Sequence, residues 1–152
     1  MTVLPVDLML DDATIDMTFQ GNKEITVSIK IDTVAMDEML AKADYISLHV
    51  PSLGKALLGA EEMAKMKDGV ILVNTARGGT IDENALLTAL ESGKVGGAGL
   101  DVFDNEPTPR ADLINHPKVS VSPHIGASTL EAQRNIGLEL AEKLMDLFGE
   151  VS

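Results

Sequence analysis

The sequence predicts an α/β fold built around a parallel sheet. Short apolar runs at 45–50 and 70–73, bounded by glycine or proline, are typical of strands buried on both faces. Between them lie segments whose apolar residues recur at helical spacing, and no internal repeat is visible. Strands and helices that alternate in this way predict a single domain over residues 1–152.

Composition narrows the class of protein. The 152 residues are 45% hydrophobic and 3% aromatic, enough for one domain with an aliphatic core. The absence of cysteine excludes disulfides and thiolate metal sites, and we expect no metal centre. A net charge of -12 argues against nucleic acids and anionic membranes as partners. Without an apolar span or the basic start of a signal peptide, the expected location is the cytoplasm.

The first segment is a short apolar run, Val3–Val6, that ends in Asp7. A carboxylate at the end of such a strand can accept hydrogen bonds from a ribose diol. Asp11 and Asp12 follow closely, so a helix or turn cap is an equal alternative. Spacing alone leaves both readings of Asp7 open.

Residues 14–31 differ from the rest because apolar and polar residues alternate strictly. The first alternation ends at Phe19 and the second begins at Ile25, with Gly21 and Asn22 between them. Two alternating runs around a Gly-Asn turn predict a β-hairpin. We see no chemistry in it, and a cover or a subunit contact is its expected role.

Next come a short helix at 37–43, a strand at 45–50 and a helix at 61–67 that ends before Gly69. Pro51 ends the strand because it cannot donate a hydrogen bond to a neighbour. His49 lies at the strand end and can touch a ligand, although a structural role is the commoner one for such a histidine.

The stretch Ile71–Thr80 is central to the interpretation. A buried strand runs into the loop Asn74–Gly79, and open parallel sheets bind ligands beyond the carboxyl ends of their strands. Arg77 is the strong cation of this loop, and its planar fork of donors suits a carboxylate. A solvated arginine in an ordinary loop is the alternative. We favour a functional loop, since loops on rigid scaffolds often carry function.

A helix is expected to begin after Thr80, which has capping-box spacing to Glu83, with Asp82 as a rival cap. The glycine-rich run 96–103 follows it. It lacks the third glycine of a dinucleotide-binding motif and precedes a strand instead of following one. Its glycines more plausibly let two backbones approach closely, and the strand 98–102 places Asp101 near its carboxyl end.

The last strand, 119–121, stops before Pro123, and a final helix follows. Ser128 and Glu131 have capping-box spacing, and apolar residues recur at helical spacing from Ile136 to Leu144. His116, which precedes a proline, is most simply part of a turn.

Three strand ends thus offer a cation, an acid and an imidazole: Arg77, Glu106 and His124. Near a hydride acceptor, such a set can oxidise an alcohol. The arginine would bind a carboxylate, the histidine would take the hydroxyl proton, and the glutamate would hold the histidine. Three unrelated surface residues are the alternative, and residue chemistry alone does not decide between them.

From about Met36 to Glu142, the chain closely resembles the D-2-hydroxyacid dehydrogenases. Several separate motifs in the same order carry this resemblance: Ala43–Pro51, Asn74–Gly79, Gly99–Phe103, Asn105–Pro107 and Pro123–Thr129. The resemblance implies a Rossmann-type domain, NAD as cofactor and an anionic 2-hydroxy acid as substrate, and it allows a homodimer. It also implies that the helix at 128–148 leads back to a substrate domain.

The resemblance further implies site residues. Arg77, Glu106 and His124 fall on the catalytic set of the family. The positions expected to contact NAD are Asp7, His49, Val50, Pro51, Thr75, Ala76, Arg77, Asp101, His124, Gly126 and Ala127.

The chain also departs from the family pattern. It contains no Gly-x-Gly-x-x-Gly, and Met1 matches the family just after the helix that follows this motif. We therefore expect a Rossmann-type domain that lacks its first strand, phosphate loop and first helix. The hairpin at 14–31 stands where the family usually has a helix.

The missing strand would lie in the middle of the sheet, whose usual order is 3-2-1-4-5-6. We predict that Val3–Val6 closes the gap by pairing with residues 45–50, which gives a flavodoxin-like order, and that the strand near 29–34 flanks it. A dimer in which a partner's strand fills the gap is the alternative.

Overall fold

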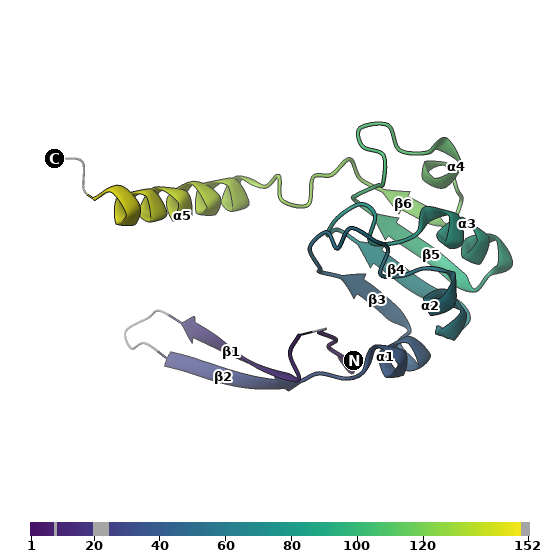
Figure 1. The fold of residues 1–152 in the computed structure, drawn as a ribbon, viewed down its shortest axis with the longest axis horizontal. Helices are drawn as coiled ribbons and strands as arrows, with labels where there is room; N and C mark the ends of the chain where they lie inside the picture. Colours follow the sequence, from purple (N-terminus) through teal and green to yellow (C-terminus); the bar gives the residue numbers. More distant parts are fainter. Residues whose placement is uncertain (8, 20–24, 150–152) are drawn as a thin grey trace.

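The computed structural model describes residues 1–7, 9–19 and 25–149, and contains two separate sheets (Figure 1). The larger is a four-stranded parallel sheet in the order β3-β4-β5-β6. Its strands are β3 (Tyr45–Leu48), β4 (Val70–Asn74), β5 (Val95–Leu100) and β6 (Val119–Val121). The predicted parallel α/β fold is confirmed, and the carboxyl ends of all four strands meet at one edge.

Three short helices link these strands in turn, α2 (Ala60–Lys65), α3 (Glu83–Ser92) and α4 (Ala111–Ile114), and a fourth, α1 (Met36–Lys42), leads into β3. Each helix buries apolar side chains in one aliphatic core, including Leu40, Met63, Leu86, Leu90 and Leu113. The strands contribute alternate residues to that core. In β3, for example, Ile46 and Leu48 are buried whereas Tyr45 is 75% exposed.

The glycines of β5 let neighbouring segments approach the strand, as predicted. A Cβ atom on Gly96 would lie 2.5 Å from the carbonyl oxygen of Gly69. One on Gly97 would lie 3.2 Å from the carbonyl oxygen of Lys118. The glycine-rich run is therefore a packing feature of the strand and not a phosphate-binding loop.

The two predicted capping boxes need correction. Asp82 caps α3, because its Oδ1 accepts hydrogen bonds from the N–H groups of Asn84 and Ala85. Thr80 instead donates its hydroxyl hydrogen to the Arg77 carbonyl oxygen. At α5 (Leu130–Phe148), the cap is Thr129 and not Ser128, since the first helical residue is Leu130.

The predicted hairpin is confirmed as an antiparallel pair of strands, β1 (Asp12–Phe19) and β2 (Ile25–Asp32). The Gly21-Asn22 turn lies outside the described residues. Both the hairpin and α5 project away from the parallel sheet (Figure 1), and none of the residues of α5 is buried. No helix in the described part of the chain is long and apolar enough to cross a bilayer.

The predicted flavodoxin-like closure is wrong. Within residues 1–7, 9–19 and 25–149, the segment Val3–Val6 forms no strand, and β3 is an edge of its sheet. Pro5 has no N–H to donate, so this run cannot form a continuous ladder. The strand near 29–34 pairs with β1 instead, and it approaches the first segment through one bond, from Val34 N–H to the Pro5 carbonyl oxygen (2.9 Å).

Candidate active site

The loop after β4 takes its shape from Asn74, a buried residue whose side chain makes three hydrogen bonds. Its Oδ1 accepts from Ala76 N–H at 3.1 Å, and its Nδ2 donates to the Arg77 carbonyl at 3.1 Å and to Thr80 Oγ1 at 2.9 Å. Sequence reasoning did not single out Asn74 by itself. A polar residue at the last position of a buried strand is the signal that identifies it.

Arg77 is exposed at the tip of this loop, and its Nη1 donates to the Ala76 carbonyl oxygen at 2.6 Å. Together with Ala76 it faces His49, Val50 and Pro51, which follow β3. These five residues line an open hollow of about 320 Å³. His49 Nε2 lies 2.9 Å from Ser47 Oγ, so its ring is oriented by its own strand. Two neighbouring strand ends are thus brought together, as the sequence predicted.

Glu106 and His124 form the clearest pair of functional groups in the site. His124 Nδ1 lies 2.6 Å from Glu106 Oε2, and Glu106 Oε1 accepts a hydrogen bond from Phe103 N–H at 2.9 Å. The hydrogen bond to His124, followed by that from Phe103, lowers the pKa of Glu106 below its ordinary value. The carboxylate is therefore ionised at neutral pH and accepts a hydrogen bond from the N–H group at Nδ1. This leaves Nε2 as the ring nitrogen that can act on a ligand.

Asp101 shapes the loop that carries His124. Its carboxylate is buried and accepts from Ser122 Oγ (2.5 Å), Ile125 N–H (2.9 Å) and Gly126 N–H (2.8 Å). Burial acts to raise the pKa of Asp101, but these three hydrogen bonds together outweigh it, and the pKa is lowered. The loop bends sharply around the carboxylate, since His124 has a left-handed backbone with φ of 53°.

The loops of Arg77 and His124 lie next to each other. A Cβ atom on Gly126 would lie 3.0 Å from Asp101 Oδ2 and 4.0 Å from Thr75 Cβ.

Asp7 takes the alternative role that its spacing allowed, because its Oδ1 accepts from the N–H groups of Met9 and Leu10. In this structure Asp7 therefore serves as an acceptor for two nearby backbone N–H groups.

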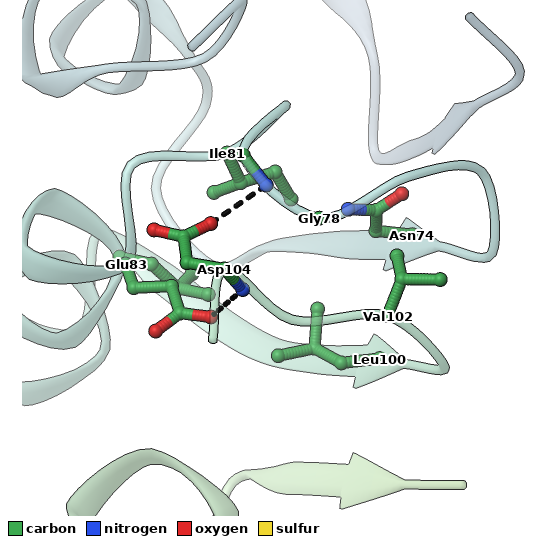
Figure 2. Close-up of a pocket in the computed structure, with 9 residues that line it drawn as sticks. Asn74, Gly78, Ile81, Glu83, Leu100, Val102 and Asp104 are labelled. Atoms are coloured by element: carbon green, nitrogen blue, oxygen red, sulfur yellow. Dashed lines mark hydrogen bonds between the residues drawn. The ribbon is translucent and has the colours of Figure 1, made fainter. Parts of the chain in front are cut away.

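A second contact joins the Arg77 loop to the segment that carries Glu106 (Figure 2). Asp104 Oδ1 accepts from Gly79 N–H at 2.6 Å, and Glu83 Oε1 accepts from Asp104 N–H at 3.0 Å. A Cβ atom on Gly78 would lie only 2.0 Å from the Phe103 carbonyl oxygen, so the two backbones touch. Sequence reasoning missed this contact, which joins residues 21 and 25 positions apart.

The fold and this site define a class. The carboxyl edge of a parallel sheet holds a glutamate-oriented imidazole, and an exposed guanidinium lies on the adjoining loop. This arrangement is typical of α/β oxidoreductases that bind a dinucleotide past the strand ends. Residues 13–126 match the model of the D-isomer specific 2-hydroxyacid dehydrogenase, NAD binding domain, and the chain belongs to this family.

Relatives within the family are named after different substrates. The chain is 50% identical to hydroxypyruvate reductase of Thermotoga maritima over 126 residues, which are 80% of the chain and 41% of that protein. It is 46% identical to D-3-phosphoglycerate dehydrogenase of Bacillus subtilis over 125 residues, or 81% of the chain and 24% of that protein. The chain thus spans less than half the length of these relatives.

Solved structures agree with this assignment. A glyoxylate reductase from Paecilomyes thermophila superposes with a TM-score of 0.73 at 45% identity and covers 78% of the chain and 37% of its own length. D-Lactate dehydrogenase from Aquifex aeolicus, complexed with NAD and lactic acid, gives a TM-score of 0.67 at 32% identity, over 78% of the chain and 41% of its own.

Proposed function

We propose that this chain supplies the catalytic groups of an NAD-dependent D-2-hydroxyacid dehydrogenase. The observation that carries the proposal is the contact of 2.6 Å between His124 Nδ1 and Glu106 Oε2. An ionised carboxylate behind an imidazole fixes its tautomer and orientation, which is what a general base needs. The neighbouring loop adds Arg77, whose guanidinium is suited to a substrate carboxylate.

Each of these residues has a defined task in the oxidation. Arg77 binds the carboxylate of the 2-hydroxy acid and orients the carbon that bears the hydroxyl group. His124 accepts the hydroxyl proton at Nε2, while Glu106 holds Nδ1–H and stabilises the imidazolium that forms. In the reverse direction, His124 returns this proton to the oxo group. NAD, when bound, supplies the hydride acceptor.

The residues of the sheet edge fit the nicotinamide part of such a cofactor. The open hollow bounded by His49, Val50, Pro51, Ala76 and Arg77 lies at the carboxyl edge of the sheet, and its lining is part apolar and part polar. Thr75, Gly126 and Ala127 lie on the two adjoining loops, and we propose that they contact the cofactor. Asp101 already serves three donors of the chain, so it would act by holding the Gly126 backbone in place.

Among the possible substrates we favour D-3-phosphoglycerate, which would be oxidised to 3-phosphohydroxypyruvate in serine biosynthesis. The run Ala127–Gln133 resembles D-3-phosphoglycerate dehydrogenases more than glyoxylate or hydroxypyruvate reductases. The named relatives include both kinds, so a direct comparison of substrates is the appropriate test. A homodimer and a cytoplasmic location remain predictions.

One observation favours a second function, that of a binding module without turnover. The 152 residues contain no Gly-x-Gly-x-x-Gly, the loop that normally holds the pyrophosphate of a dinucleotide at a helix N-terminus. If that loop is not supplied by further chain or by a partner, the paired Glu106 and His124 would lack a bound cofactor to work with.

NADH oxidation by the chain separates the two functions. It should be followed with 3-phosphohydroxypyruvate, hydroxypyruvate and glyoxylate, each at saturating NADH. Turnover that His124→Ala lowers roughly a hundredfold would support the dehydrogenase, since this is the scale of general acid–base catalysis. His116→Ala is the matched control, because His116 lies in a turn where its Nδ1 accepts from Lys118 N–H. Turnover unchanged by His124→Ala would refute the proposal.

A further inference from the structure

Glu83 is a buried carboxylate that the proposed chemistry does not use. It is the first residue of α3 and is only 9% exposed. Asp82 already caps this helix, so Glu83 is not needed for capping. Burying a carboxylate costs free energy, and an apolar residue of similar volume would pack at lower cost. The position therefore needs an explanation other than packing.

The partner of Glu83 provides that explanation. Phe103 and Asp104 are consecutive residues, and each donates its backbone N–H to a different glutamate. Phe103 N–H donates to Glu106 Oε1 at 2.9 Å, and Asp104 N–H donates to Glu83 Oε1 at 3.0 Å. The two peptide units that flank the Phe103 Cα are thus each held by one carboxylate, Val102–Phe103 by Glu106 and Phe103–Asp104 by Glu83. Because Glu106 contacts His124 with its other oxygen, the orientation of these adjoining peptides influences the position of the imidazole.

Asp104 completes a closed ring of contacts (Figure 2). Its Oδ1 accepts from Gly79 N–H at 2.6 Å, and the chain from Gly79 leads directly into α3 and back to Glu83. The loop that bears Arg77 and the segment that bears Glu106 are therefore both fixed to the start of α3. Such second contacts hold catalytic groups at the geometry that turnover requires.

We propose that Glu83 is a positioning residue that sets the Phe103–Asp104 backbone, so that Glu106 meets His124 at a fixed place relative to the Arg77 loop. The catalytic meaning of this inference rests on the proposed function. The positioning itself does not, because it can be measured without cofactor or substrate.

The pKa of Glu83 is consistent with a free-energy cost for burying its carboxylate. Burial raises the pKa of Glu83, and the hydrogen bond from Asp104 N–H offsets only part of this effect. The charged groups that act on it are Asp104, Arg110 and Asp112.

Nuclear magnetic resonance of the whole chain tests the proposal with three variants. Glu83→Gln keeps a carbonyl acceptor of the same reach, Glu83→Asp keeps the charge but withdraws the acceptor by one methylene, and Glu83→Ala removes both. Glu91→Ala is the matched control, since Glu91 is an exposed glutamate on the same helix. Two signals report the result: exchange of the Phe103 and Asp104 amide protons, and the low-field proton on His124 Nδ1.

We expect Glu83→Asp and Glu83→Ala to speed exchange of both amides by roughly tenfold or more, the loss expected for a hydrogen bond to a charged group. The His124 Nδ1 proton signal should broaden or vanish in both. Glu83→Gln and the control should keep wild-type signals. If Glu83→Ala does not fold, Glu83→Asp decides.

Two outcomes would overturn the positioning role. One is wild-type amide exchange and His124 signal in folded Glu83→Asp or Glu83→Ala. The other is equal loss of the signals in Glu83→Gln, which would show that an acceptor at this position is not sufficient to set the backbone. Loss of the proposed function appears separately, as turnover that does not depend on His124.

Discussion

Replacing Asp101 should uncouple the His124 loop from the sheet. The buried Asp101 carboxylate accepts three hydrogen bonds, two of them from the backbone of the residues that follow His124. Asp101→Ala removes both acceptor oxygens, and with them all three hydrogen bonds, while leaving Ser122, Ile125 and Gly126 with donors to satisfy. Asp101→Asn keeps one acceptor oxygen but turns an amide N–H group toward one of the donors.

The expected loss in the free energy of unfolding follows from the number and strength of these hydrogen bonds. A hydrogen bond to a charged group contributes about 1.5–3 kcal/mol. Ile125 and Gly126 are exposed residues, so water can replace part of what they lose, and the lower end of the range applies. At about 1.5 kcal/mol for each of the three bonds, we expect Asp101→Ala to lower the free energy of unfolding by about 4.5 kcal/mol, and Asp101→Asn, which loses one of them, by about 1.5 kcal/mol. Either is a large part of the 5–15 kcal/mol that is usual for a domain.

The dependence on pH provides a second check. Because folding lowers the pKa of Asp101, its contribution is present above the ordinary aspartate pKa of about 3.9 and is lost as pH falls through the lower folded value. The difference between wild type and Asp101→Asn should therefore shrink in acid. No shrinkage would contradict the assignment of the lowered pKa to this carboxylate.

Urea unfolding followed by circular dichroism measures these differences, with unchanged slopes if the denatured states are alike. Asp68→Asn is the control, since Asp68 pairs with Lys94 at the surface and is 88% exposed. The midpoint of its urea unfolding should equal that of the wild type. The reasoning is refuted if Asp101→Ala also unfolds at that midpoint.

Three further predictions concern the site. NADH should bind this chain with a dissociation constant of about a millimolar, or ~4 kcal/mol, because the glycine-rich loop is missing and the chain is acidic; micromolar binding by calorimetry would contradict this. Glu106→Gln should change the pH profile of turnover, since it removes the carboxylate that holds His124, and an unchanged profile at every pH would exclude that role. Gly78→Ala should destabilise the chain by about 1–3 kcal/mol, because its Cβ would meet the Phe103 carbonyl, whereas Gly137→Ala in the open middle of α5 should stabilise it by about 0.5–1 kcal/mol. Urea unfolding of both glycine variants should give changes of opposite sign.

The sequence by itself determined the elements whose signals are local. Buried strands appear as short apolar runs, so β3, β4 and β6 were predicted at nearly their observed positions, and strict alternation revealed the hairpin. The same logic predicted that Arg77, Glu106 and His124 lie near one edge of the sheet, because parallel strands end there, but it left their convergence open. The expected contact between Glu106 and His124, which are 18 residues apart, is present in the structure as a hydrogen bond.

Only the tertiary structure decided the contacts between distant segments. Thr80 and Ser128 have the right spacing for caps, yet Asp82 and Thr129 take that role because the helices begin one or more residues later. Pairing of Val3–Val6 with β3 was predicted from the need to fill a sheet, but among the described residues β3 remains an edge strand, and Pro5 has no N–H to give to a ladder. Glu83 and Asp104 look like ordinary surface acids in the sequence. Their partners are backbone N–H groups more than twenty residues away, and every residue except proline carries an N–H, so no pattern of side chains can reveal such a bond.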